Sequence, residues 1–333
     1  METAPLPDAL ADGSVLVRVD LATICGSDLH TWLGRRPTPI PGVLGHEGVG
    51  RVVAVGHGVG HWLGRRITWS LAASCGRCAA CTRHGLPQKC RELKKVGHDA
   101  LESGDGWHGT YASHLVLPAG THLVEVPASI PDRVAAPANC AWATVAAMLE
   151  TLPQPCELAV VQGAGMLGLG ACAMLRARGV ERVVVVDVAE PRLAHAAAFG
   201  AEPALATARA HCAPRSADLV VELSGDPRVV AEGLDLLRPG GAYHFAGFVH
   251  PDSRFELAGE RLVRGCLVLR GFHNYAPRHL DQALAYLADP PQVPWPELIP
   301  APLPLERLDE AFALAAQRTR LRIAVRADLG PPP

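Results

Sequence analysis

The chain has 333 residues, which is enough for two domains that each bury an apolar core. Its 31 basic and 33 acidic residues give a formal net charge of −2, so no excess of one sign predicts binding to nucleic acid or to an anionic membrane. The first residues form neither a basic start nor an apolar stretch of secretory length, and no later apolar run reaches about 18 residues. We therefore expect a cytoplasmic protein whose partners are small molecules.

Two secondary-structure patterns follow each other along the chain. From Ser14 to about Val126, short β-rich runs alternate with Gly, Pro and polar loops, which predicts an irregular, mainly antiparallel domain. From about Pro155 to Gly271, apolar runs alternate with amphipathic segments, which predicts an α/β domain with a parallel sheet and crossover helices. Helices around His279–Ala288 and Glu306–Gln317 and a strand at 321–327 should follow. We expect this tail to fold back onto the first domain.

A glycine-rich segment follows the apolar run LAVVQ and precedes an amphipathic one. In a dinucleotide-binding unit, the first glycine of GxGxxG allows a tight turn, the second admits the pyrophosphate, and the third lets helix and strand pack closely. We expect the cofactor to bind this loop through Gly163, Gly165, Met166, Leu167 and Gly168. The alternative is a glycine-rich turn that binds nothing.

The end of the next apolar run bears on the choice of cofactor. Asp187 stands 19 positions beyond Gly168, where an acidic side chain accepts hydrogen bonds from the adenosine ribose and repels a 2′-phosphate. This position favours NAD over NADP, although Arg192 can weaken the preference. If the Asp187 carboxylate only caps a helix, no preference follows.

Four cysteines form a compact group that we call the cysteine lobe, residues 75–90. Its spacing, Cys75-x2-Cys78-x2-Cys81-x8-Cys90, is typical of a zinc site. Four thiolates leave no open coordination position, so a zinc ion here should be structural. A disulfide pair or a chance cluster is the alternative, and a nucleic-acid-binding zinc ribbon is disfavoured because the lobe is neither strongly basic nor aromatic.

Two further segments, Cys25-Gly-Ser27-Asp28-Leu-His30 and Gly45-His46-Glu47, precede the cysteine lobe and the glycine loop. Their order and approximate intervals resemble those of the zinc-containing medium-chain alcohol dehydrogenases, over nearly the whole chain. The resemblance implies a GroES-like catalytic domain, formed by residues 1–140 and 275–333, and a doubly wound NAD-binding Rossmann domain, formed by residues 141–274. It also implies an oxidoreductase with two zinc ions per chain.

The resemblance assigns a catalytic metal site to four residues. It makes Cys25, His46 and Cys140 the ligands of a catalytic zinc, and Glu47 the adjacent carboxylate that can approach the metal when bound water leaves. Asp28 matches the carboxylate that orients the ligating histidine. Three protein ligands leave one position for water or alcohol, whose pKa a divalent ion lowers.

A proton relay completes the implied site. Ser27 matches the hydroxyl beside the metal, and His30 matches the outer end of the relay, reached through the cofactor ribose; histidine suits this role because it titrates near physiological pH. Each residue alone has an ordinary alternative, such as a core thiol for Cys25 or a helix cap for Ser27. Two departures from the family pattern are a spacer before Cys90 that is one residue longer, and Gly64-Arg-Arg-Ile in place of Gly-Asp-Arg-Val.

Residues that bracket the predicted zinc ligands are candidates for the substrate pocket, although each Trp among them is more often part of a core. They are Trp32, Trp69, His98, Trp107, Asn139 and Trp142. Arg91, Lys94 and Lys95 have the charge to bind an anionic substrate, but lysines beside a zinc lobe are usually solvated. The pocket candidates therefore do not identify the substrate.

Local resemblances leave the substrate class open. The segments CRELKKVGHD, GLPQKC, PANCAWATVAA and HNYAPRHLDQAL resemble a subgroup associated with phosphonate catabolism, whereas SDLH resembles polyol and threonine dehydrogenases. The substrate is then an alcohol or its carbonyl product, and two classes of alcohol are possible. One is a hydroxyalkyl phosphonate or another anionic alcohol, and the other is a neutral polyol, cyclitol or amino alcohol.

Two other classes of function are compatible with part of the pattern. A non-catalytic dinucleotide-binding sensor would keep the fold and the cysteine lobe, and a zinc-independent reductase would use the same fold without metal. Both are disfavoured because the open-site ligands and the relay are present together. The resemblance also implies a homodimer or homotetramer, for which the short apolar run CLVLRG at the end of the second domain is the expected contact.

Overall fold

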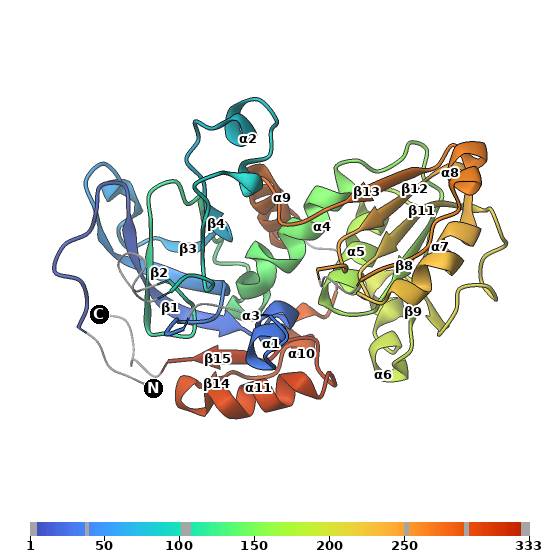
Figure 1. Cartoon of the computed structure of the whole chain (residues 1–333). Coiled ribbons are helices and arrows are strands. Elements are labelled where there is room, and N and C mark those ends of the chain that lie inside the picture. Colours follow the sequence, from blue (N-terminus) through green and yellow to red (C-terminus); the bar gives the residue numbers. More distant parts are fainter. Residues whose placement is uncertain (1–4, 37–39, 101–107, 250–252, 290–292, 328–333) are drawn as a thin grey trace. The chain divides into compact units, whose positions relative to one another are not determined.

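The structure, a computed structural model, describes residues 5–36, 40–100, 108–249, 253–289 and 293–327 (Figure 1). These residues form two compact units. The first comprises the described residues up to Ala143, those of 274–289 and those from Pro294 onward, and the second comprises those of Thr144–His273 together with Val293. None of the described helices is long and apolar enough to cross a bilayer.

A seven-stranded sheet is the frame of the first unit. Its strands are β1 (Val15–Thr23), β2 (Glu47–Val55), β3 (Arg66–Trp69), β6 (His114–Leu117), β7 (Leu123–Glu125), β14 (Leu303–Pro304) and β15 (Ala324–Arg326). They lie in the order β14-β15-β1-β2-β3-β7, and β6 also pairs with β1. All pairs are antiparallel except β14 with β15. Because Ala22 of β1 lies opposite Val325 of β15, the C-terminal tail belongs to this sheet.

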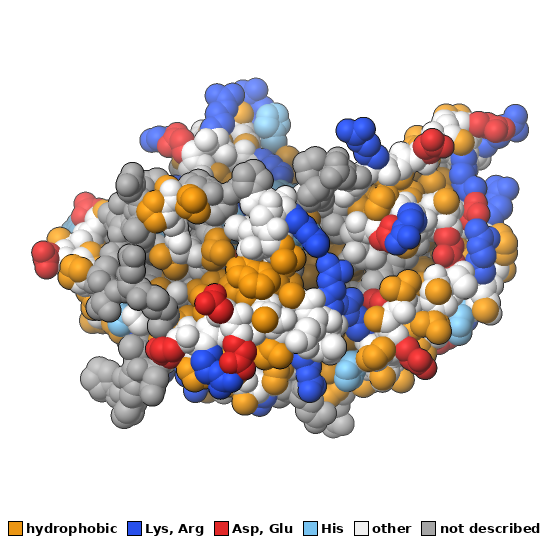
Figure 2. Space-filling view, turned by 60° about the horizontal axis from the view of Figure 1, so that its bottom comes forward, with side chains coloured by type: hydrophobic (Ala, Val, Ile, Leu, Met, Phe, Trp, Pro, Cys, Tyr) orange, Lys and Arg blue, Asp and Glu red, His pale blue; other side chains and the backbone are white. Residues whose placement is uncertain are grey.

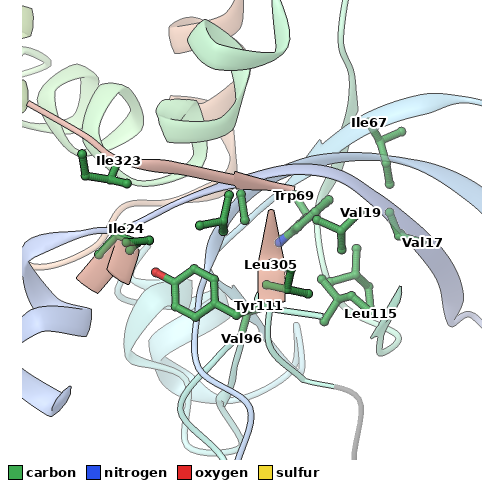
Figure 3. Close-up of a cluster of buried hydrophobic side chains, with 14 of the residues drawn as sticks. Val17, Val19, Ile24, Ile67, Trp69, Val96, Tyr111, Leu115, Leu305 and Ile323 are labelled. Atoms are coloured by element: carbon green, nitrogen blue, oxygen red, sulfur yellow. The ribbon is translucent and has the colours of Figure 1, made fainter. Parts of the chain in front are cut away.

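Alternation along β1 buries one face of this sheet. Val15, Val17 and Val19 lie in the apolar core, whereas Arg18 and Asp20 form an ion pair of 2.7 Å between partly exposed side chains. Figure 3 shows side chains of β1, β3 and β6 meeting residues of the C-terminal tail in one cluster. This core holds β1 and β2 in the register that positions the residues following β1 and preceding β2.

Short elements surround the sheet of the first unit. The helices are α1 (Gly26–Trp32), α2 (Ala79–Thr82), α3 (Asp132–Ala135), α9 (Pro277–Ala288), α10 (Trp295–Leu298) and α11 (Leu308–Ala316), and β4 (Ala72–Ala73) pairs with β5 (Lys94–Lys95). Helix α9 begins with a proline, and its buried residues Leu280, Ala283, Leu284 and Leu287 follow the helical period. Helix α4 (Ala141–Leu149) begins in the first unit and continues from Thr144 in the second.

A six-stranded parallel sheet is the frame of the second unit. Its strands are β8 (Leu158–Gln162), β9 (Arg182–Asp187), β10 (Glu202–Leu205), β11 (Ala217–Glu222), β12 (Leu237–Phe245) and β13 (Val268–Gly271). They are connected by α5 (Met166–Ala177), α6 (Glu190–Leu193), α7 (Val230–Leu236) and α8 (Gly259–Gly265). The order β10-β9-β8-β11-β12-β13 reverses direction between β8 and β11. This is the doubly wound topology that binds dinucleotides at the reversal point.

Short 3-10 helices are also present among the described residues. They span Gly60–Trp62, Pro87–Lys89, Ala136–Asn139, Ala196–Phe199, Pro227–Val229 and Leu305–Arg307. Figure 2 shows basic and acidic side chains interspersed with apolar ones on the viewed face of the molecule. This mixture agrees with the formal net charge of −2.

Candidate active site and metal centres

The first unit brings four predicted ligands together. The Sγ atoms of Cys25 and Cys140, a ring nitrogen of His46 and a carboxylate oxygen of Glu47 all lie within 4.8 Å of one another. The two sulfurs are 3.8 Å apart, the separation that two Zn–S bonds of about 2.3 Å produce in a tetrahedral site. The set of two sulfurs, one nitrogen and one oxygen therefore fits zinc.

The ends of three elements position these ligands. Thr23 of β1 pairs with Glu47 of β2, so the residue two places after β1 and the residue just before β2 meet at one end of the sheet. Cys140 follows the 3-10 helix 136–139, where the amide of Asn139 donates to the His46 carbonyl at 2.9 Å. Residues that are far apart in sequence are thus held by backbone pairing and by one buried amide.

His46 is oriented by Asp28. Its Nδ1 atom lies 3.1 Å from Asp28 Oδ1, while Oδ2 of Asp28 accepts hydrogen bonds from the Tyr111 hydroxyl at 2.7 Å and from the Cys25 amide at 3.0 Å. Burial lowers the pKa of His46, but the charge and hydrogen bond of Asp28, together with those of Cys25, raise it well above its usual value. With Nδ1 directed at Asp28, Nε2 is the nitrogen free to bind a metal.

The pKa values of the two thiols in this group shift in opposite directions. The hydrogen bond with Cys140 is the largest influence on the pKa of Cys25 and, with the positive charges of Arg322 and His46, lowers it well below its usual value despite burial. The pKa of Cys140 is raised by the same hydrogen bond and by burial. Of the two thiols, Cys25 is thus the one whose ionisation is favoured, and a thiolate is the form that binds a metal.

Glu47 has a partner that the sequence analysis missed. Both carboxylate oxygens lie 2.9 Å from the guanidinium of Arg322, and the Thr23 hydroxyl donates to one of them at 2.6 Å. Arg322 also approaches Cys25 Sγ at 3.7 Å. Burial raises the pKa of Glu47, and the charge of Arg322 opposes that shift only in part. The one available signal was a single arginine among apolar residues in the segment LRIAV.

The two predicted relay residues lie on α1. Ser27 Oγ lies 3.5 Å from His46 Nε2, the nitrogen that faces the candidate metal site. His30 follows three residues later, on the same side of the helix. Both side chains are half-buried. Ser27 is therefore beside the metal-ligand group, and one helical turn separates it from His30.

The predicted pocket residues lie in different environments, some in the core and some beside the metal-ligand group. Trp69 and Trp142 are at most 1% exposed and belong to the core, where Trp142 packs on Trp295 with ring centroids 4.2 Å apart. Trp32 is 42% exposed, and His98 packs on His46 with ring centroids 5.4 Å apart. Trp107 lies outside the described residues. Among the described candidates, His98 and Asn139 are thus the two that contact the metal-ligand group.

The cysteine lobe forms a second group of four ligands. The sulfurs of Cys75, Cys78, Cys81 and Cys90 lie within 4.8 Å of one another, and Cys78 Sγ is 3.6 Å from Cys81 Sγ and 3.9 Å from Cys90 Sγ. Backbone hydrogen bonds from Arg91 and Cys81 lower the pKa of Cys78 to about 6. The long spacer is accommodated by the 3-10 helix 87–89 immediately before Cys90. Four sulfurs in this arrangement fit a closed zinc site.

The second unit contains the glycine loop between β8 and α5. Gly163 has a φ of +107°, and a Cβ on Gly168 would lie 1.7 Å from the Gly163 carbonyl oxygen, so glycine is required at both positions. A Cβ on Gly165, which precedes Met166 and Leu167 at the start of α5, would meet no protein atom within 4 Å. The loop is therefore tightly packed at its ends and open in the middle, as a pyrophosphate-binding turn requires.

Asp187 ends β9 beside this loop. One carboxylate oxygen accepts a hydrogen bond from the Ala164 amide at 2.8 Å, and the other accepts one from the Ala189 amide at 2.8 Å. Arg192 approaches the carboxylate at 3.7 Å. Asp187 thus supports the glycine loop, a contact that the predicted role in ribose recognition did not include.

Comparison with known proteins identifies the family. Residues 11–128 match the alcohol dehydrogenase GroES-like domain, and residues 167–289 match the zinc-binding dehydrogenase domain. L-threonine 3-dehydrogenase of Edwardsiella ictaluri (strain 93-146) is 31% identical over 288 residues, which cover 82% of this chain and 80% of that protein. This chain belongs to the zinc-containing medium-chain alcohol dehydrogenases.

Other members of this dehydrogenase family agree in sequence and in fold. Sorbitol dehydrogenase of Halalkalibacterium halodurans is 30% identical over 286 residues, covering 82% of this chain and 80% of that protein. The crystal structure of an alcohol dehydrogenase from Thermotoga maritima, 30% identical, superimposes with a TM-score of 0.88 over 98% of this chain and 94% of that one. The predicted fold class, with a GroES-like and a Rossmann unit, and the oxidoreductase class are confirmed.

Proposed function

We propose that this dehydrogenase transfers hydride between an alcohol, or its carbonyl product, and NAD, at a zinc ion bound by Cys25, His46 and Cys140. The observation that carries the proposal is the convergence of these ligands with Glu47 within 4.8 Å. When bound, zinc supplies a Lewis acid that lowers the pKa of the substrate hydroxyl, and NAD accepts the hydride. Zinc bound by the lobe, by contrast, would be structural.

The chain's own residues would prepare the site in three ways. Asp28 holds the His46 ring so that Nε2 faces the ligand group. Arg322 holds the Glu47 carboxylate in place, so Glu47 would move toward the metal only when that pair breaks. Ser27 would accept the proton of the substrate hydroxyl and pass it toward His30.

Replacement of Ser27 by Ala should slow turnover by about 10²-fold, because the general acid-base step then loses its positioned hydroxyl. Zinc content and NAD affinity should stay unchanged, since Ser27 belongs to neither predicted ligand set. The check is steady-state turnover together with metal analysis. Ser27→Thr, which keeps a hydroxyl, should retain most of the activity, and an unchanged rate in Ser27→Ala would remove Ser27 from the mechanism.

The cofactor assignment rests on the glycine loop and on the acid that ends β9. Asp187→Ala should weaken NAD binding and reduce the preference for NAD over NADP, because the ribose hydroxyls lose an acceptor and Arg192 loses its acidic neighbour. Fluorescence titration with NADH and NADPH measures the ratio of the two affinities. Glu190→Ala, which removes a nearby exposed acid, is the control. An unchanged ratio in Asp187→Ala would show that another residue reads the ribose.

The names of the relatives support a small hydroxylated substrate. They include L-threonine 3-dehydrogenase and sorbitol dehydrogenase, so we infer a polyol or amino alcohol skeleton, with a cyclitol or a hydroxyalkyl phosphonate as the other candidates. A panel of these classes, assayed by NADH formation with metal-quantified protein, identifies the class. If protein that holds two zinc ions and binds NAD turns over no substrate of this panel, the non-catalytic sensor is favoured instead.

The assembly and the location are part of the same proposal. Strand β13 is the last strand at one edge of the parallel sheet, and Val268 on it is 53% exposed. An exposed apolar edge of this kind supports a homodimer or homotetramer formed through β13. Analytical ultracentrifugation tests this by measuring the mass of the oligomer. All ten cysteines are free, and zinc-binding thiols need a reducing compartment such as the cytoplasm.

A further inference from the structure

Tyr275 lies outside both predicted ligand sets, yet its hydroxyl contacts the residue that precedes Cys140. It belongs to the segment just before α9, and its side chain is 4% exposed. The hydroxyl donates a hydrogen bond to the Asn139 carbonyl and accepts one from the Leu71 amide at 3.3 Å. Because both partners are backbone groups, these contacts fix the course of the main chain.

Asn139 is the residue through which this hydroxyl reaches two of the predicted ligands. It is completely buried and ends the 3-10 helix 136–139, so the main chain passes directly from its carbonyl to Cys140. Its side-chain amide donates to the His46 carbonyl at 2.9 Å. Tyr275 thus holds the main chain of Asn139, and His46 holds its side chain. The position of Cys140 relative to His46 depends on both hydrogen bonds.

Leu71 gives the Tyr275 hydroxyl a fixed support. It stands just before β4, and its carbonyl accepts a hydrogen bond at 3.0 Å from the amide of Val96, which follows β5. Ala72 of β4 pairs with Lys95 of β5, so Leu71 extends this two-stranded ladder. The Tyr275 hydroxyl therefore connects a hydrogen-bonded ladder of the first unit to the turn before Cys140.

The turn before Cys140 needs such a support more than the other ligand segments do. The pairing of β1 with β2 places Cys25 and His46, whereas Cys140 lies between a 3-10 helix and α4, and its amide bonds within the turn, to Pro137 at 3.2 Å. Ligand distances in a metal site must stay within about 0.2 Å of their ideal values. A small displacement of this turn would therefore weaken zinc binding.

We propose that Tyr275 is a positioning residue of the catalytic zinc site, whose hydroxyl holds the Asn139 carbonyl and so keeps Cys140 in place for the metal. This inference rests on the proposed function, because it requires zinc to bind at Cys25, His46 and Cys140. Tyr275 acts through Cys140 and takes no part in the chemical step.

The first measurement is the rate at which zinc leaves the protein. Tyr275→Phe removes the hydroxyl and keeps the ring, so the Asn139 carbonyl and the Leu71 amide lose their buried partner. Zinc-loaded protein is mixed with a colour-forming chelator. The catalytic zinc should leave about 10-fold faster in Tyr275→Phe than in the wild type, an effect typical of residues that orient metal ligands. The zinc of the cysteine lobe should leave at an unchanged rate. Cys25→Ala and Cys78→Ala, which each lack one site, identify the two phases.

Tyr243→Phe is the matched control. It also removes a buried tyrosine hydroxyl, which donates to Gln162 at 2.6 Å in the second unit, and it should leave both release rates unchanged. Equal release of the catalytic zinc by Tyr275→Phe and the wild type would overturn the proposal. Faster release from both sites in Tyr275→Phe, or equally fast release in Tyr243→Phe, would also overturn it, because either result indicates a general loosening of the protein.

A spectroscopic measurement separates positioning from a loss of stability. Cobalt(II) exchanged for the catalytic zinc absorbs visible light in a way that depends on its ligand geometry. A displaced Cys140 should therefore change the spectrum of cobalt-substituted Tyr275→Phe, whereas Tyr243→Phe should keep the wild-type spectrum. A wild-type spectrum in Tyr275→Phe would contradict the proposal and leave Tyr275 with a purely structural role.

Failure of this inference and failure of the proposed function give different results. If alcohol oxidation by the wild type requires the catalytic zinc, but Tyr275→Phe releases that zinc at the wild-type rate, the proposed function stands and Tyr275 has no role at the metal. If the wild type oxidises alcohols after both zinc ions are lost, the proposed function is contradicted, and the release rates still decide whether Tyr275 positions Cys140.

Discussion

Cys25→Ala and Cys140→Ala should each remove one zinc ion per chain and abolish alcohol oxidation while the protein stays folded. A catalytic metal supplies several kcal/mol of transition-state stabilisation, so the loss of activity should be about 10³-fold or more. The fold should survive because the core of the first unit is built from the sheet and does not include these two residues. Metal analysis, turnover and thermal unfolding measure the three effects.

The cysteine lobe provides the contrast. Cys78→Ala should also remove one zinc ion, but its main effect should be a lower melting temperature, because a closed zinc site contributes its binding free energy to folding. Cys266→Ala, which removes an exposed thiol of the second unit, should change neither metal content nor stability. Equal unfolding in Cys25→Ala, Cys140→Ala and Cys78→Ala would contradict the division into catalytic and structural sites.

Arg322→Met should lower the free energy of unfolding of the first unit by about 3–5 kcal/mol, since it leaves the Glu47 carboxylate buried without its counter-charge. Glu47 is completely buried and Arg322 is 8% exposed, so water does not replace the lost partner. Urea unfolding followed by tryptophan fluorescence measures this effect, because the five tryptophans that the structure describes belong to the first unit.

A double variant and a pH series test the cause. Adding Glu47→Gln to Arg322→Met should recover part of the lost stability, because the uncompensated charge is then gone. Burial already raises the pKa of Glu47, and loss of Arg322 raises it further. A carboxyl with a raised folded pKa loses stability as pH rises above its unfolded pKa, so the deficit should be smaller at about pH 5.5 than at about pH 7.5. A deficit that does not change with pH would indicate lost packing instead.

Short motifs made much of the candidate site predictable. The cysteine lobe and the glycine loop are local, and their chemistry requires particular residues at fixed spacing, so Cys75 to Cys90 and Gly163 to Gly168 could be located without a structure. The alternation of apolar runs likewise predicted an antiparallel and a parallel unit, because strand period and crossover length are visible in one sequence.

Long-range partners were not predictable in this way. Arg322 pairs with a residue 275 positions away, and no local pattern specifies that pair. Trp69 was a pocket candidate, but its place in the core depends on which face of β3 packs inward.

Alcohol oxidation by this dehydrogenase should depend on a zinc ion bound by Cys25, His46 and Cys140. NADH formation and zinc content are measured together on three samples of the protein. The first is untreated, the second has lost its exchangeable zinc to a chelator, and the third has had zinc added back. Activity should disappear when the zinc bound by these three residues is removed, and it should return when one zinc ion per chain is restored. Full activity in protein that has lost both zinc ions would contradict this prediction.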